Sequence, residues 1–183
     1  MLKMLRTWDI FDTLIARKCV FPHIVFQIME QISKINGFAN IRGAAADFAV
    51  KKDKSCNLDD IYNAMCKISN IPYQIAEKLK QLECDIEIDQ AIPITENVNQ
   101  VKSGDILISD MYLPEEIIRK MLDKIGLFVP VELVITTSGK TQKGGGYGSN
   151  LKNRNPICFI QAIIWKPIFG IHESMDLILH IHR

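Results

Sequence analysis

The sequence predicts an α/β protein with a parallel sheet and an inserted helical cap. Two short apolar runs, at 104–110 and 131–138, flank a helical stretch at 113–126, and strand–helix–strand order at this spacing is typical of parallel strands. An earlier strand near Thr7 is separated from this unit by about seventy residues with helical periodicity. We therefore expect a sheet core that is interrupted by a helical insertion.

The N-terminal part is expected to form one strand and four helices. The run from Met4 to Ile15 is strand-like and then turns. The first helix carries apolar residues at spacings of three and four and ends at Gly37, which tolerates the left-handed conformation of a helix end. Asn57 is a suitable N-cap for the third helix, and Pro72 suits the first turn of the fourth. The four helices are predicted over residues 22–35, 41–52, 57–68 and 71–89.

The C-terminal part returns to an alternating order of strands and helices after Pro93. A short apolar strand over 104–110 precedes a helix over 113–126, which begins at Pro114 and stops at Gly126. The helical stretch between the first strand and this part is the predicted insertion. The expected domains are a sheet core made of residues 1–20 and 93–183, and a cap made of residues 21–92.

The composition argues against several classes of partner and compartment. The chain of 183 residues is 48% hydrophobic and 23% charged, with a formal net charge of +1, so nothing in its charge favours nucleic acid or an acidic membrane as a partner. The five cysteines have neither metal-binding spacing nor an even number, which favours a reducing compartment. No stretch approaches the roughly 18 uninterrupted apolar residues of a membrane span. We find no secretory signal and expect a cytoplasmic protein.

Asp9 is the first candidate for chemistry, because it lies near the end of the first strand. Open α/β sheets bind ligands at the carboxyl ends of their strands. A carboxylate placed there can attack phosphorus or carbon, or share a divalent metal ion. Thr13, one turn later, can hydrogen-bond a phosphate oxygen. The simpler interpretation is that Asp9 and Asp12 terminate the strand and cap a turn.

Two later positions are candidates for holding an anion. Ser109 ends the strand at 104–110, and a helix with unpaired N-terminal amides begins a few residues later. Lys140 and Lys143 follow the strand at 131–138, where a lysine can neutralise a nucleophilic carboxylate and a transferring phosphoryl group. The structural alternatives are a turn serine and a flexible surface loop. The run KGGGYG that begins at Lys143 matches neither common phosphate-binding glycine motif.

An aspartate, a serine and a lysine that follow three successive strands resemble the site of the haloacid dehalogenase-like hydrolase superfamily. The segments FDTL, ILISDMYLP and TTSGKTQK are similar in particular to a bacterial branch that begins FDIFDTL and carries SDMYLP as its second motif. Members of this branch often accompany glycosyltransferases of surface-polysaccharide synthesis. GFANIRGAAADFAV and LDDIYNAM resemble the helical cap of the branch, and the match covers roughly residues 5–148.

The resemblance implies a Rossmann-like core and a phosphatase that uses magnesium and an aspartyl-phosphate intermediate. Its substrate would be a small phosphorylated molecule, such as a sugar phosphate. The resemblance also implies a link to surface-polysaccharide glycosyltransferases. The site residues that it implies are Asp9 as nucleophile and magnesium ligand, Ser109 and Lys143 (with Lys140 as the alternative) as further catalytic residues, and Thr13 and Asp110 as substrate contacts.

The chain departs from the superfamily pattern in two places. Phe11 stands where many members have a second aspartate that acts as acid and base, so we expect slow turnover. After Lys143 the usual acidic metal motif is not found, and the acids there are Glu173 and Asp176, in a different sequence context. A truncation or a shifted reading frame near Gly148 would produce this pattern, and we expect the C-terminal part of the sheet core to be incomplete.

Three functions follow from these observations. The leading hypothesis is a phosphomonoester phosphatase. The first alternative is a catalytically inactive or truncated relative that acts as a binding or accessory protein, because a nucleophile without its metal would repel a phosphate dianion. The lesser alternative is hydrolysis of a carbon–halogen bond, because true haloacid dehalogenases also lack the second aspartate.

Overall fold

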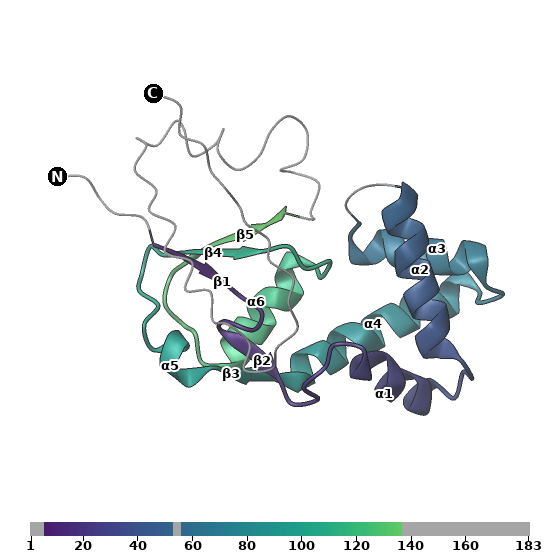
Figure 1. Cartoon of the computed structure of the whole chain (residues 1–183), viewed down its shortest axis with the longest axis horizontal. Coiled ribbons are helices and arrows are strands. Elements are labelled where there is room, and N and C mark those ends of the chain that lie inside the picture. The colour runs from purple at the N-terminus through teal and green to yellow at the C-terminus, as the bar shows by residue number, and fades with distance from the viewer. Residues whose placement is uncertain (1–5, 53–55, 137–183) are drawn as a thin grey trace, which may run out of the picture.

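The computed structural model describes residues 6–52 and 56–136, which form a mixed α/β structure with a sheet lobe and a helical lobe (Figure 1). In chain order the elements are β1 (Thr7–Asp9), β2 (Ile15–Arg17), α1 (Ile24–Ser33), α2 (Phe38–Lys52), α3 (Leu58–Ile68), α4 (Tyr73–Gln90), β3 (Ala91–Pro93), α5 (Thr95–Val98), β4 (Ile106–Ser109), α6 (Glu115–Lys124) and β5 (Glu132–Ile135). The helical lobe consists of α1–α4, and the other elements form the sheet lobe.

The main sheet is parallel, as the strand–helix–strand order predicted. Its strand order is β1-β4-β5, with Trp8 opposite Leu107 and Ser109 opposite Ile135. The apolar face of α6, which includes Ile118 and Met121, belongs to the same buried cluster as Trp8 and Leu107. The connection through α6 therefore brings β4 and β5 side by side with their carboxyl ends at one edge.

The chain leaves the sheet lobe at β2 and returns to it at β3. These strands pair antiparallel, with Ala16 opposite Ile92, and the amide of Lys18 donates to the carbonyl of Gln90 at 2.9 Å. Neither strand was expected from the sequence. Each has three residues, and its partner lies on the far side of four helices, so no local pattern signals the pairing.

The helical lobe contains the four helices that the sequence predicted. α3 shows the clearest local control, because the side chain of Asn57 accepts a hydrogen bond from the amide of Asp60 at 2.9 Å. Asp60 in turn accepts from the amide of Asn57 at 3.1 Å, which completes a capping box. These reciprocal bonds satisfy two amides that a helix start otherwise leaves unpaired.

The end of α1 differs from the expectation. Lys34, rather than Gly37, takes the left-handed cap position, with a φ of 59° and its amide donating to the carbonyl of Glu30. Gly37 belongs instead to the turn into α2, where its amide and that of Ala39 donate to the Glu30 carboxylate at 2.9 and 3.0 Å. These two bonds lower the pKa of Glu30, because they favour its charged form.

α4 is the longest helix and extends from the helical lobe to the sheet lobe (Figure 1). At its C-terminal end, Lys124 of α6 donates to the carbonyls of Ile88 and Asp89 at 2.7 and 2.5 Å. A lysine at this position satisfies carbonyls of the last helical turn and interacts favourably with the helix dipole. The two lobes are thus joined through α4, whose C-terminal end is bonded to α6 of the sheet lobe.

Replacing the N-cap of α3 tests whether the capping box supports the helical lobe. We expect Asn57→Ala to lower the free energy of unfolding by about 1 kcal/mol, because the amide of Asp60 loses its acceptor. Denaturant unfolding followed by circular dichroism measures this loss. Asn63→Ala is the matched control, since Asn63 is exposed within α3 and alanine suits a helix interior. An equal loss in both variants would contradict the capping role.

Candidate active site at the carboxyl edge of the parallel sheet

Asp9 and Ser109 lie at neighbouring positions on the carboxyl edge of the main sheet. Asp9 is the last residue of β1 and is opposite Ile108, so Ser109 follows one residue further along β4. Ser109 is itself opposite Ile135 of β5, and the hydroxyl of Thr136 donates to the Ser109 carbonyl at 3.4 Å. The parallel register therefore gathers these strand ends at the edge where open α/β sheets bind ligands.

The turn after β1 is formed by an unusual backbone conformation at Asp12. Its φ is 58°, in the left-handed region that non-glycine residues rarely adopt but aspartate tolerates. The amide of Asp12 donates to the carbonyl of Ile15 at 2.8 Å, and the amide of Ile15 donates to that of Ile10 at 2.9 Å. Asp12 is thus part of a tight turn that directs the chain from β1 into β2.

A cleft of about 640 Å³ lies between this edge and the helical lobe, within the roughly 300–1,000 Å³ typical of ligand sites. Its lining includes three carboxylates, which we call the acidic rim. It also includes two arginines, which we call the arginine side, and aromatic side chains that contribute apolar surface. These residues are Asp9, Asp12 and Asp110 of the acidic rim, Arg17 and Arg42, and Phe11, Phe26 and Tyr112.

Ser109 and Thr13 are not among the described residues that line the cleft. Ser109 is 2% exposed, and its hydroxyl oxygen accepts a hydrogen bond from the amide of Met111 at 3.1 Å. Thr13 is half-buried, and its carbonyl accepts from the side chain of Asn97 at 2.8 Å. Of the predicted site residues that the structure describes, it therefore places Asp9 and Asp110 on the cleft, and Ser109 beside them.

The surroundings of Asp9 raise the pKa of its carboxyl group. Although the residue is exposed at the sheet edge, the atoms around it remove part of the carboxylate's hydration, and this desolvation is the largest cause. A hydrogen bond involving the backbone of Ile10 acts in the opposite direction, and the negative charges of Asp110 and Asp12 raise the pKa further. The surroundings of Asp9 therefore disfavour its ionised form relative to its protonated form.

The acidic rim has the donor chemistry that magnesium prefers. This ion binds through one or two carboxylates together with waters and substrate phosphates, and Asp9 and Asp110 supply two such carboxylates. Ion pairs within the described residues do not include the three carboxylates of the rim. Over the same part of the chain, no group of three or more His, Cys, Asp or Glu side chains is placed to hold a metal by itself.

Four other predicted residues lie outside the described ranges. They are the two candidate lysines and the two C-terminal acids, namely Lys140, Lys143, Glu173 and Asp176. Their roles stay predictions.

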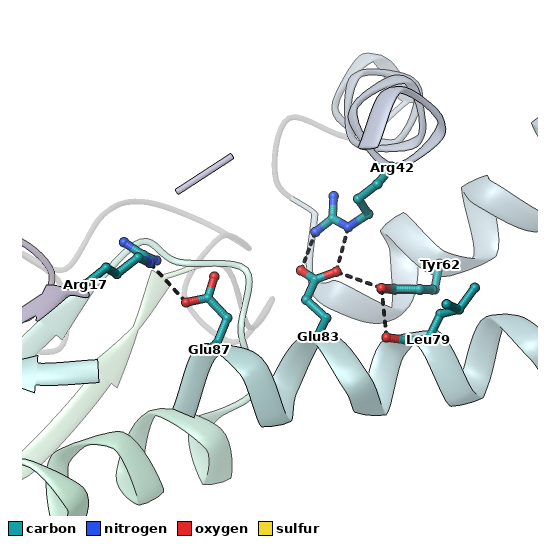
Figure 2. Close-up of polar contacts among 6 residues, drawn as sticks. All are labelled: Arg17, Arg42, Tyr62, Leu79, Glu83 and Glu87. Carbon is teal, nitrogen blue, oxygen red and sulfur yellow. Dashed lines mark hydrogen bonds and ion pairs between the residues drawn. The ribbon is translucent and has the colours of Figure 1, made fainter. Parts of the chain in front are cut away.

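The arginine side of the cleft rests on two buried ion pairs with α4 (Figure 2). The guanidinium of Arg42 forms two parallel hydrogen bonds to the carboxylate of Glu83, at 2.7 and 2.8 Å. The hydroxyl of Tyr62 donates to the same carboxylate at 2.7 Å. Since Arg42 and Glu83 are 1% and 0% exposed, the pair is fully removed from water. The paired charges raise the pKa of Arg42 despite its desolvation.

Tyr112 connects this network to the loop after β4. Its ring lies over the Arg42 guanidinium, 5.0 Å from ring centroid to Cζ, and its carbonyl accepts from the amide of Leu58 at 2.9 Å. Burial, followed by the negative charge of Glu83, raises the pKa of the Tyr112 hydroxyl well above its usual value. The loop that carries Asp110 is therefore fastened to the helical lobe on both its side-chain and backbone sides.

Arg17 forms the second ion pair, at the junction of the two lobes. Its Nε donates to Glu87 of α4 at 3.0 Å, and its Cζ lies 5.0 Å from the centroid of the Phe11 ring. Desolvation raises the pKa of Glu87, and the charge of Arg17 offsets this only in part. Arg17 and Arg42 were not predicted as site residues from the sequence. The signal that could have identified them is an arginine within an otherwise apolar run, as in TLIARK and NIRGAAADF.

Comparisons with known proteins leave the family open. No protein-family model matches the sequence, and no curated protein matches it. In the part of the chain that the structure describes, none of the helices has the length and apolar character needed to cross a membrane.

Breaking the Arg42–Glu83 pair is expected to be far more damaging than removing both partners. Arg42→Met leaves Glu83 buried and unpaired and should lower the free energy of unfolding by about 3–5 kcal/mol, whereas Arg42→Met/Glu83→Met should recover most of that loss. Denaturant titrations of the three proteins measure both effects.

The control for this pair is an exposed one of the same kind. Arg119→Met removes an arginine that bonds Glu115 one helical turn away on the surface of α6, and should cost roughly 0.5 kcal/mol or less. A single Arg42→Met variant no less stable than Arg119→Met would contradict the structural importance of the buried pair.

Proposed function

We propose that the chain is a haloacid dehalogenase-like hydrolase that acts as a magnesium-dependent phosphomonoester phosphatase. The observation that carries the proposal is Asp9, which ends a parallel strand inside an acid-rimmed cleft overlain by a helical lobe. Support for a Rossmann-like core comes from the parallel order β1-β4-β5. In this proposal α1–α4, inserted between β2 and β3, act as the cap that covers the substrate.

The proposed reaction has two steps at one carboxylate oxygen. In the first, an Asp9 oxygen attacks phosphorus, the bond from phosphorus to the leaving-group oxygen breaks, and that oxygen takes up a proton from solvent water. This gives an aspartyl-phosphate and a free alcohol. In the second, water attacks phosphorus and gives up a proton to the solvent, the bond between phosphorus and the Asp9 oxygen breaks, and inorganic phosphate leaves with the carboxylate restored.

The residues around Asp9 would share the remaining tasks. Magnesium held by Asp9 and Asp110 would neutralise charge on the rim and on the phosphate. Ser109 and Lys143 are proposed to bind the phosphate oxygens, as the sequence resemblance implies. Because Phe11 carries no acid to protonate the leaving group, turnover should be lower by about 10²–10⁴ than in an enzyme with one.

The substrate is proposed to be a small phosphate ester such as a sugar phosphate. The cleft volume and its apolar and arginine-bearing wall suit a compact leaving group. A cytoplasmic site of action and a link to surface-polysaccharide glycosyltransferases belong to the same proposal, and both follow from the composition and the sequence resemblance.

Hydrolysis of an aryl phosphate, with and without magnesium, tests the function. We expect turnover that requires magnesium, and Asp9→Asn should reduce kcat by at least about 10³-fold, because it removes the nucleophile. Asp123→Asn is the matched control, since Asp123 is an exposed acid on α6 away from the cleft, and it should retain full activity.

Other outcomes of this experiment favour the other two functions. Binding of phosphate esters by a folded protein without turnover would favour an inactive binding or accessory protein. Release of halide from a 2-haloacid, with no release of phosphate from esters, would favour carbon–halogen hydrolysis. Equal activity in wild type and Asp9→Asn would exclude Asp9 as nucleophile.

The raised pKa of Asp9 predicts how pH affects the stability of the metal-free protein. Because the folded state holds the Asp9 proton more tightly than the unfolded state, this contribution to stability is present below the usual pKa and lost as pH rises through the raised one.

Asp9→Asn should therefore be more stable than wild type at neutral pH, and this gain should shrink as the solution is acidified. Denaturant midpoints of the two proteins, measured across the acidic range and at neutral pH, check the prediction. A gain that does not depend on pH would contradict a raised pKa at Asp9.

A further inference from the structure

Arg17 holds a hydrogen-bond donor that nothing in the described chain satisfies. Its Nη2 is buried and has no hydrogen-bond partner among the described residues, and no other buried side-chain nitrogen or oxygen there is in this state. The side chain is 4% exposed, yet Arg17 forms part of the cleft wall. A buried polar group without a partner is costly and rare, so this nitrogen calls for an acceptor.

The neighbouring arginine shows how Arg17 differs. Two nitrogens of the Arg42 guanidinium donate to one carboxylate, and three aromatic rings surround the group. Arg42 therefore directs these donors to a partner within the protein. Arg17 uses Nε alone toward Glu87, and the Phe11 ring supports its guanidinium plane. Glu87 and Phe11 therefore fix the direction of Nη2 before any ligand arrives, which lowers the entropy cost of binding.

The charges around the cleft indicate which kind of acceptor fits. The Arg17–Glu87 and Arg42–Glu83 pairs are each neutral as units, so the arginine side offers no uncompensated positive charge. The acidic rim of the same cleft would repel a second anionic group on the substrate. An uncharged oxygen can accept from Nη2 without this repulsion.

We infer that Arg17 is a specificity-determining residue that donates Nη2–H to an uncharged hydroxyl or carbonyl oxygen on the leaving group of the phosphate ester. This inference rests on the proposed function for the orientation of the ester, with its phosphate at Asp9. It selects leaving groups with a neutral oxygen over plain alkyl groups and over carboxylates. Because Nη2 is buried, this contact requires the atoms that cover it to move aside when the ligand binds.

Three series of straight-chain alkyl phosphates of increasing length test the selection. Their far ends carry a methyl group, a hydroxyl group or a carboxylate, so that size and phosphate are matched. We expect kcat/KM of wild type to favour the hydroxyl series over the methyl series by at least about tenfold at the length that reaches Arg17. The carboxylate series should be the poorest.

Two variants assign the preference to Arg17. Arg17→Lys keeps the charge beside Glu87 but carries all its donors on one nitrogen and has none at the position of Nη2, so the ratio between the hydroxyl and methyl series should fall to about one. The control is Arg6→Lys, since Arg6 likewise lies over an aromatic ring, that of Trp8, and pairs with a carboxylate, that of Asp105, outside the cleft. It should keep the wild-type ratio.

The outcomes separate this inference from the proposed function. If no ester is hydrolysed, the phosphatase proposal fails, and calorimetric dissociation constants for the same three series decide the role of Arg17. Equal dissociation constants for the methyl and hydroxyl series in wild type would overturn the inference, because Nη2 would then donate no hydrogen bond to the ligand. A preference for the carboxylate series would overturn the choice of an uncharged oxygen. The comparison within wild type does not depend on whether Arg17→Lys folds.

Discussion

Two buried glutamates on one face of α4 fix how the two lobes of this protein meet. Glu83 and Glu87 lie one helical turn apart, and their partners come from different lobes, Arg42 from α2 and Arg17 from β2 (Figure 2). Burying such charges costs several kcal/mol per ion unless they are paired. Any movement that separates α4 from either arginine would leave a charge uncompensated, so α4 holds both lobes in one arrangement.

The cleft is a consequence of this arrangement. The same two arginines line it, and the carboxyl ends of β1 and β4 place Asp9 and Asp110 of the acidic rim in it. Tyr112 bonds the loop after β4 to the helical lobe through its carbonyl and its ring. These two contacts fix the position of the loop relative to Leu58 and Arg42. In the proposed function, the sheet edge carries the reaction at phosphorus, and the arginine side selects the leaving group.

Local sequence signals predicted the parts of this structure that local forces decide. Asn57 predicted the start of α3, and the apolar runs around Leu107 and Val134 predicted parallel strands. The carboxyl ends of such strands place Asp9 beside Ser109. The β2–β3 pairing and the glutamate–arginine pairs were not predicted. Their partners are distant in sequence, and a charged residue in an apolar run does not reveal what neutralises it.

Three energetically unfavourable features of the described chain belong to residues that line the cleft. Asp12 adopts a left-handed conformation, desolvation and neighbouring charges disfavour the ionised form of Asp9, and Arg17 has a buried donor without a partner. Asp12 is explained by the turn into β2, where its amide donates to the carbonyl of Ile15. A hydrogen bond involving the backbone of Ile10 offsets the cost at Asp9 only in part, and no described residue accepts from Nη2 of Arg17. In the proposed function, a phosphate ester with its cation would compensate these last two together, since the cation would offset the charge at Asp9 and the leaving group would accept from Arg17. Unfavourable features that a single ligand compensates at more than one point are expected at a binding site.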